Sequence, residues 1–313
     1  NDEKTIYWYT KSAKQGYAWA QISLGWRYAN GIEKNDENAV YWYQKAAVQG
    51  NVLAQKWLAN GYVTGKGIER NDDKAFYWYQ KAAELGDPLS QYNLGISYYS
   101  GLGVVKNHEK AVYWFQKSAD QGWADAQTNL GNKYSYGEGV EKNEKQAVYW
   151  FQKAADQGDA YGQVLLGHRY VNGRGIAKSY EKAVYWFQKS ADQGDKDAQF
   201  MLGNMYRLGK GIEKSDELAL HWYQKSADQG DASAQARLGH MYIKGKGIEK
   251  NEEQAFYWYK KSANQGHDYA QHCLGLLYKE GTGIELNKEK ARYWFGKAAE
   301  QGYKDSRIEL SEL

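Results

Sequence analysis

Apolar and polar residues alternate along the chain with the period of an α-helix. In one segment the apolar residues fall at positions i, i+3, i+4, i+7 and i+8: Ala147, Trp150, Phe151, Ala154 and Ala155. Residues with this spacing share one face of a helix. The pattern predicts an amphipathic helix with a wide apolar stripe, called helix B below.

A second helical pattern precedes the first. Ala126, Leu130, Gly131 and Tyr134 are spaced i, i+4, i+5 and i+8, which again defines one helix face. This segment is called helix A. Neither helix can bury its apolar face alone, so the two patterns predict that successive helices stack on one another.

Local signals place the ends of these helices. Asn143 is a favourable N-cap for helix B, and Gln146 three residues later resembles a capping box. Asp159 is the corresponding N-cap for the next helix A. Gly137 and Gly158 follow helix A and helix B, where glycine commonly ends a helix.

The two patterns recur with a fixed period. The recurring glycines are Gly16, Gly50, Gly86, Gly122, Gly158, Gly194, Gly230, Gly266 and Gly302. A tryptophan follows the same period: Trp8, Trp42, Trp78, Trp114, Trp150, Trp186, Trp222, Trp258 and Trp294. The first interval is 34 residues and the others are 36, so a deletion of two residues falls after Tyr28, where we expect a loop. Such a period is the signature of a stacked repeat architecture.

The repeated residues resemble those of a known family. The first part reads Ala-x-x-x-Leu-Gly-x-x-Tyr-x-x-Gly-x-Gly, and the second reads Ala-x-x-Trp-(Tyr/Phe)-x-Lys-(Ala/Ser)-Ala-x-x-Gly. Both are similar to the Sel-1-like repeat, a relative of the tetratricopeptide repeat. The resemblance implies an all-α fold, namely a right-handed α/α superhelical solenoid of about nine helix-A/helix-B repeats of 36 residues. We expect residues 1–313 to form a single solenoid domain that begins in a helix B and ends in a helix A.

The two ends of the chain add two expectations. Residue 1 is Asn1 rather than Met, and the first helix B has no helix A before it, so we expect a fragment or a processed form. Ser306 to Leu313 has the pattern of a final helix A with polar positions such as Glu309 and Glu312. A terminal repeat needs a polar outer face, so we expect this helix to be the C-terminal cap.

Charge and composition exclude several classes of protein. The 41 Lys and Arg nearly balance the 38 Asp and Glu, and the charges are interleaved, which argues against nucleic-acid binding. The longest apolar runs are about five residues, against the roughly 20 needed to span a bilayer, so we expect no membrane span. Cys273 is the only cysteine, so the cysteine-rich branch of the family, with a disulfide in each repeat, is a poor match.

No motif indicates catalysis, a metal or a cofactor. His168 and His240 occupy equivalent positions two repeats apart, too distant to share a metal ion. His267, His272 and Cys273 lack the i, i+4 spacing of helical zinc ligands. We therefore expect a protein that is not an enzyme and holds no cofactor or metal.

Two variable positions of helix A are the candidate partner-binding positions. One lies two residues before the leucine of Leu-Gly and the other directly after its glycine, and both vary while the framework repeats. By analogy with tetratricopeptide repeats they line a concave groove, where aromatic and amide side chains suit peptide recognition. Packing of some of these residues against neighbouring helices is the alternative. The predicted groove residues are Trp26, Tyr92, Ile96, Asn132, His168, Phe200, Asn204, His240 and His272.

A tyrosine precedes most of the repeated tryptophans. It lies about 200° from the framework alanine around helix B, toward the convex side. Such a ladder could stack against a glycan, but an amphipathic ring covering neighbouring helices is the favoured interpretation. The residues are Tyr41, Tyr77, Tyr113, Tyr149, Tyr185, Tyr257 and Tyr293.

The resemblance implies a function in protein binding. We expect a bacterial scaffold that binds a protein or peptide partner in the groove, in a periplasmic or exported location rather than the cytoplasm. A more specific interpretation is an immunity protein against a lipase effector of a type VI secretion system, which would make a secreted toxin the partner. The alternatives are a β-lactamase-like or cell-wall hydrolase and a glycan- or peptidoglycan-binding virulence factor.

Overall fold

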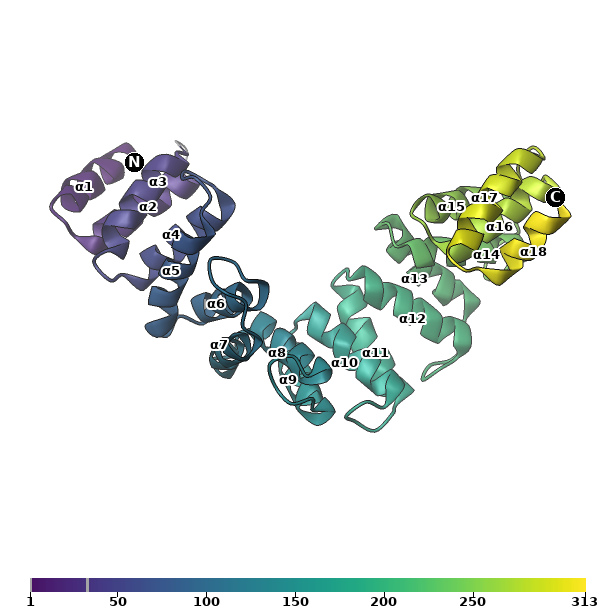
Figure 1. Ribbon diagram of the computed structural model, residues 1–313, viewed down its shortest axis with the longest axis horizontal. Helices are drawn as coiled ribbons and strands as arrows, with labels where there is room; N and C mark the ends of the chain where they lie inside the picture. The colour runs from purple at the N-terminus through teal and green to yellow at the C-terminus, as the bar shows by residue number, and fades with distance from the viewer. Residues whose placement is uncertain (1, 32–33) are drawn as a thin grey trace. The chain divides into compact units, whose positions relative to one another are not determined.

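The computed structural model describes residues 2–31 and 34–313, and the regular structure in these residues is entirely helical (Figure 1). Eighteen helices alternate in the order that the two sequence patterns predict, which confirms the all-α solenoid class. The first nine are α1 (Asp2–Lys14), α2 (Ala18–Asn30), α3 (Asp36–Ala47), α4 (Val52–Thr64), α5 (Asp72–Glu84), α6 (Pro88–Ser100), α7 (His108–Asp120), α8 (Ala124–Tyr136) and α9 (Glu144–Asp156). The other nine are α10 (Ala160–Asn172), α11 (Tyr180–Asp192), α12 (Lys196–Leu208), α13 (Asp216–Asp228), α14 (Ala232–Lys244), α15 (Glu252–Asn264), α16 (Asp268–Glu280), α17 (Lys288–Glu300) and α18 (Lys304–Glu312).

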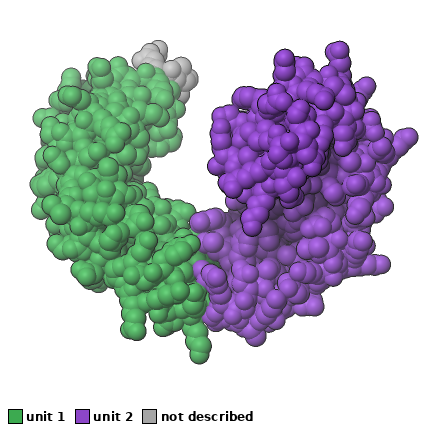
Figure 2. Space-filling model, turned by 45° about the vertical axis from the view of Figure 1, so that its right-hand side comes forward, with its two compact units in different colours: residues 1–157 green, residues 158–313 purple. Residues whose placement is uncertain are grey.

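The helices form two compact units (Figure 2). Unit 1 comprises residues 1–157 with helices α1 to α9, and unit 2 comprises residues 158–313 with helices α10 to α18. Within each unit every helix packs against the next one in the chain. The even-numbered helices correspond to helix A of the sequence pattern and the odd-numbered helices to helix B.

Helix ends lie where the caps predict them. The side chain of Asn143 accepts hydrogen bonds from the backbone N–H groups of Lys145 and Gln146, at 3.1 and 3.0 Å. That is the N-cap half of a capping box, and among the described residues no bond returns from the Gln146 side chain. Asp159 caps α10 by accepting from the Gly162 N–H at 2.6 Å. Gly137 ends α8 with a φ of 73° in the left-handed region.

The framework residues of the two patterns form the core of each unit. In α8 and α9, Leu130 and Phe151 are fully buried. Gly131 faces this ring so closely that a Cβ atom there would lie 2.5 Å from the Cε1 atom of Phe151. The leucine recurs fully buried in each helix A from α2 to α16: Leu24, Leu58, Leu94, Leu130, Leu166, Leu202, Leu238 and Leu274.

A ladder of glutamine side chains joins successive repeats. In the first layer of this amide ladder, a glutamine on helix A donates to a carbonyl of the preceding helix B, as Gln127 donates to Ala119 at 3.1 Å. In the second layer, the glutamine that ends the following helix B donates to that same side chain, as Gln157 donates to Gln127 at 2.7 Å. The second-layer bonds are Gln49–Gln21, Gln121–Gln91, Gln157–Gln127, Gln193–Gln163, Gln229–Gln199, Gln265–Gln235 and Gln301–Gln271.

The second layer of the amide ladder has a gap. Leu85 stands where the other repeats carry the second-layer glutamine, and it is 60% exposed. Its would-be acceptor, Oε1 of Gln55, is buried without a hydrogen-bond partner.

The loop from helix A to helix B reaches back to the previous repeat. In the loop between α8 and α9, Gly139 lies against the backbone of His108 and Glu109 at the start of α7. The predicted two-residue deletion affects the connection from α2, which ends at Asn30, to α3, which begins at Asp36. Residues 32 and 33 of that connection lie outside the described residues.

Candidate partner-binding site

The predicted groove residues lie on the even-numbered helices, four residues apart within each helix. Residues spaced i, i+4 share a helix face, so each pair presents one surface. This face is called the variable face. At the position two residues before the framework leucine, Ile22 and Val164 are only 3% and 4% exposed, so they pack against neighbouring helices.

In unit 1 the variable face carries Trp26, Tyr92, Ile96 and Asn132. Trp26 is 51% exposed. Tyr92 packs on Phe115 with ring centroids 5.9 Å apart, and its hydroxyl accepts a hydrogen bond from Asn129 at 3.4 Å. Ile96 and Asn132 are half-buried. This part of the site thus combines one open indole with side chains partly held by their neighbours.

In unit 2 the variable face also contacts the core. Phe200 packs on Tyr223 with centroids 5.8 Å apart. The buried Tyr223 hydroxyl donates to Oδ1 of Asn204 at 2.8 Å, so this amide has a structural partner. His168 meets Phe187 edge-on, with centroids 5.3 Å apart.

The last histidines of the variable face have different environments. His240 is half-buried, and its Nδ1 atom lies 3.2 Å from the Tyr269 hydroxyl. His272 is 8% exposed, stacks on Tyr303 with centroids 4.8 Å apart, and pairs with the Ser306 hydroxyl at 2.9 Å. Packing against Tyr303 and Ser306 therefore accounts for His272.

Burial sets the charge state of these imidazoles. Loss of contact with water lowers the pKa of His168, His240 and His272 below the ordinary value. Nearby cations, among them Lys246 and Lys244, lower the pKa of His240 further, whereas Asp305 opposes the shift at His272. The three rings are therefore neutral near pH 7 and can donate or accept hydrogen bonds.

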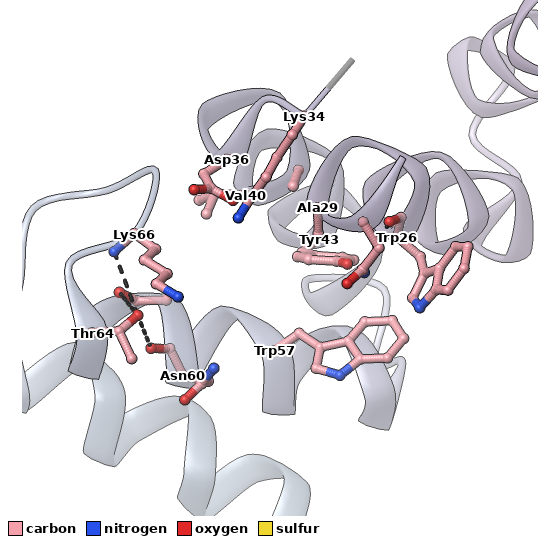
Figure 3. Close-up of a pocket in the computed structure, with 13 residues that line it drawn as sticks. Trp26, Ala29, Lys34, Asp36, Val40, Tyr43, Trp57, Asn60, Thr64 and Lys66 are labelled. Carbon is pink, nitrogen blue, oxygen red and sulfur yellow. Dashed lines mark hydrogen bonds between the residues drawn. The ribbon is translucent and has the colours of Figure 1, made fainter. Parts of the chain in front are cut away.

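Sequence reasoning missed a hollow in unit 1. It is about 410 Å³ in volume and lies between α2, α3 and α4, where Trp26 and Trp57 line one end (Figure 3). A second hollow of about 230 Å³ shares both indoles and adds Trp19 and Arg27. The sequence does mark Trp57 as unusual, because the equivalent positions of other repeats carry residues such as Ser23, Asn93 and Asn129.

Unit 2 has a smaller hollow on the same kind of face. It measures about 220 Å³, and its lining includes Phe200, Arg237, His267 and Tyr269. Burial lowers the pKa of His267, so this hollow offers a neutral imidazole beside one guanidinium.

The tyrosine ladder on the odd-numbered helices has a uniform geometry. Tyr149, for example, is 48% exposed and meets Trp150 edge-on, with ring centroids 4.9 Å apart. The ammonium group of Lys153, one turn later, lies 5.4 Å from the Tyr149 ring centroid. Each tyrosine of the ladder meets its tryptophan edge-on. In every one of these repeats except that of Tyr293, a lysine one turn later lies over the tyrosine ring.

Three features of the described residues bear on other site chemistries. No group of three or more His, Cys, Asp or Glu side chains is placed to hold a metal ion. Cys273 is a free thiol, and burial raises its pKa. No helix in residues 2–31 or 34–313 combines the length and apolarity that a bilayer crossing needs.

A family model of the Sel1 repeat matches nearly the whole chain. The matched residues are 1–17, 20–51, 52–87, 88–123, 124–159, 160–195, 196–231, 232–267 and 268–303. These nine matches follow the period of the recurring glycines. A comparison with curated protein sequences finds no match.

Solved structures of repeat proteins resemble the chain over its length. The protective antigen c5321 of uropathogenic Escherichia coli, which displays an SLR fold, is 35% identical with a TM-score of 0.90. That similarity covers 97% of this chain but only 66% of c5321. A Sel1 repeat protein of Oxalobacter formigenes is 31% identical with a TM-score of 0.77, over 98% of this chain and 90% of its own.

One further similarity concerns a protein of named role. Immunity protein Pa5087 of Pseudomonas aeruginosa is 21% identical over 68% of this chain and 81% of its own, with a TM-score of 0.42. At that TM-score the similarity carries no argument about this chain.

Proposed function

Because this chain belongs to the Sel1 repeat family, whose repeats mediate protein interactions, we propose that it is a scaffold that binds a protein or peptide partner on its variable face. The observation that carries this proposal is the contrast within each even-numbered helix. The framework leucine is fully buried in each even-numbered helix from α2 to α16, whereas the position directly after the framework glycine holds partly exposed indole, amide and imidazole groups, as at Trp26, Asn132 and His168. Indoles are among the groups that protein interfaces favour at their centres, and amide and imidazole groups can donate and accept hydrogen bonds from a partner.

The neutral state of the histidines supports the same function. Unprotonated imidazoles pair with backbone groups of a peptide without the desolvation cost of a buried charge. His168 and His240 both present such a ring, half-buried on the variable face.

The first prediction concerns the partner of this face. We expect Asn132→Ala with His168→Ala and His240→Ala to weaken partner binding by tenfold or more, since truncation of central contacts costs about 2 kcal/mol or above. Asn204 is left unchanged because it holds the Tyr223 hydroxyl. The measurement is a pull-down with the purified chain from separate cytosolic and periplasmic extracts, followed by mass spectrometry.

The matched control changes three tyrosines of the ladder, Tyr41→Ala, Tyr149→Ala and Tyr185→Ala. It should retain the partner at wild-type stoichiometry. Loss of the partner with this control alone would show that the variable face is not the binding surface.

A more specific role within this function is immunity against a secreted toxin. The family resemblance of the repeats supports it, and no catalytic module accompanies them within residues 1–313. An immunity protein forms a tight one-to-one complex and protects cells from one toxin, whereas a general adaptor binds several partners more weakly. The stoichiometry of the captured complex and a toxin-protection assay distinguish the two roles.

A further inference from the structure

Unit 1 contains an aromatic surface that the other repeats do not repeat. Trp26 follows the glycine of helix A in α2, where most repeats carry asparagine or histidine, and Trp57 precedes the framework leucine in α4. The Trp57 ring packs on Tyr43, with centroids 5.0 Å apart. The two hollows that share Trp26 and Trp57 are together called the Trp hollow.

The Trp hollow is open to an incoming side chain. Trp26 is 51% exposed and Trp19 is 70% exposed. Indoles in such positions supply a large apolar contact area and a donor group at low entropic cost, which makes them frequent anchors of protein interfaces. The larger hollow, at about 410 Å³, falls within the range of about 300–1,000 Å³ typical of binding pockets.

Charge distinguishes the two ends of the Trp hollow. The indoles stand at one end, and the ammonium groups of Lys34 and Lys66 stand at the other (Figure 3). Both lysines are exposed, and neither forms an ion pair with a carboxylate of the described residues. Among the described residues that line the larger hollow, Asp36 is the one carboxylate beside these two cations.

We propose that the Trp hollow binds an acidic segment of a partner protein that carries an aromatic or large aliphatic side chain. The apolar side chain would lie between Trp26 and Trp57, and the acidic residues would face Lys34 and Lys66. An excess of cations beside an apolar anchor site selects such a segment over a basic one, because like charges brought together at an interface cost several kcal/mol. This inference rests on the proposed function and names the chemistry of its partner.

Peptide selection on the full chain tests the inference. A display library of random dodecapeptides is selected against the wild type, and the enriched peptides are then measured by fluorescence polarisation. We expect them to carry net negative charge and at least one aromatic or large aliphatic residue. Trp57→Ala should weaken them by about tenfold or more, the effect of losing an interface anchor, and Lys34→Glu with Lys66→Glu should do the same.

Matched variants control for folding and for general charge effects. Tyr136→Ala removes an aromatic ring that is 72% exposed, and Lys153→Glu reverses an exposed lysine, both in unit 1 outside the Trp hollow. Both should leave peptide affinity within twofold. If circular dichroism shows that Trp57→Ala disturbs the fold, the variant with Lys34→Glu and Lys66→Glu tests the inference instead. Both lysines are exposed on the surface, so their replacement should leave the fold intact.

The outcomes separate this inference from the proposed function. Enriched peptides without acidic bias, or peptides that bind Trp57→Ala and the charge-reversed variant normally, would overturn the inference. If such peptides are lost on the Asn132, His168 and His240 triple variant, the proposed function stands while the inference falls. A selection that yields no peptide also overturns the inference, and the pull-down then decides the proposed function on its own.

Discussion

At the scale of single residues, the amide ladder shows how one side chain links two repeats. Gln127 uses its amide nitrogen on one neighbour and its oxygen on another, so both of its polar atoms are satisfied in a buried place. Gln55 makes only the first of these bonds, at 3.2 Å to the Ala47 carbonyl. Its buried oxygen lacks a donor because Leu85 replaces glutamine. A buried acceptor without a partner costs free energy of folding.

The second prediction is that Leu85→Gln stabilises the chain. The new amide should donate to Oε1 of Gln55 and raise the free energy of unfolding by about 1 kcal/mol, the usual net value of one hydrogen bond. Chemical denaturation followed by circular dichroism measures the change. Leu85→Ala removes the exposed leucine without adding a donor and should give no gain. In a Gln55→Ala background, Leu85→Gln should also give no gain in stability, because the alanine lacks the acceptor oxygen.

Single residues of the candidate site were only partly predictable from the sequence. Trp26 stood out because it replaces the usual asparagine or histidine at a variable position. Trp57 was missed because its importance depends on the hollow between α2, α3 and α4, which needs three-dimensional packing. Conversely, the sequence suggested His272 for partner binding, whereas Tyr303 and Ser306 of the following segment bury it.

At the scale of elements, the loop that contains Gly139 positions α8 and α9 on the repeat before them. Gly139 has a φ of 73°, in the left-handed region that favours glycine. A Cβ atom here would overlap the carbonyl group of His108 and lie 2.8 Å from the Glu109 nitrogen. Gly158 also has a left-handed φ, at 91°, but a Cβ atom there meets nothing within 4 Å.

The third prediction compares these two glycines. Gly158→Ala should cost about 1–2 kcal/mol, the strain of a left-handed alanine. Gly139→Ala should cost a further 1–3 kcal/mol or so, because its methyl group also forces the loop away from α7. Unfolding curves of both variants measure the difference. Equal losses would mean that backbone strain alone decides the cost and that the loop contact with α7 contributes nothing.

The helices themselves were predictable because their signals are local. Asn143, Asp159 and Gly137 fix helix ends through contacts with residues two to four positions away. The order of helices followed from periodicity for the same reason. The division into units 1–157 and 158–313 has no such local signal, since the repeats on both sides of residue 158 have the same pattern.

At the scale of the whole molecule, the buried histidines are unevenly distributed between the two units. Burial is the first cause of a lowered pKa at His168, His240, His267 and His272, all in unit 2. His267 also caps α16, where its Nδ1 atom accepts from the Ala270 N–H at 3.4 Å. Protonation would remove this acceptor and place a positive charge at a helix N-terminus.

The fourth prediction is that acid destabilises the chain through unit 2. A histidine in the unfolded chain has a pKa of about 6.5, and the folded pKa values are lower. At a pH between the folded and unfolded pKa values, the unfolded chain therefore binds more protons than the folded chain. The contribution of these histidines to the free energy of unfolding is therefore fully present above about pH 6.5, and it is lost as the pH decreases toward the folded pKa values. Urea midpoints at pH 7.5 and 5.5 should show this loss.

A matched variant isolates one contribution to the pH dependence. His267→Asp supplies the capping residue found at Asp231 and Asp195, and its carboxylate stays ionised at pH 5.5. This variant should lose less stability than the wild type between pH 7.5 and 5.5. An unchanged difference between the two midpoints would contradict a role for His267 in the pH dependence.

The amide ladder also has a genetic consequence. Gln199 donates to Ala191 and Gln235 donates to Ala227, so the same bond recurs 36 residues later. Loss of codons 196–231 would bring Gln235 opposite Ala191 and restore an equivalent interface from existing residues. Unequal recombination between neighbouring repeats therefore changes the length of the protein without a new junction to optimise, and the extent of its binding surface can evolve in steps of one repeat.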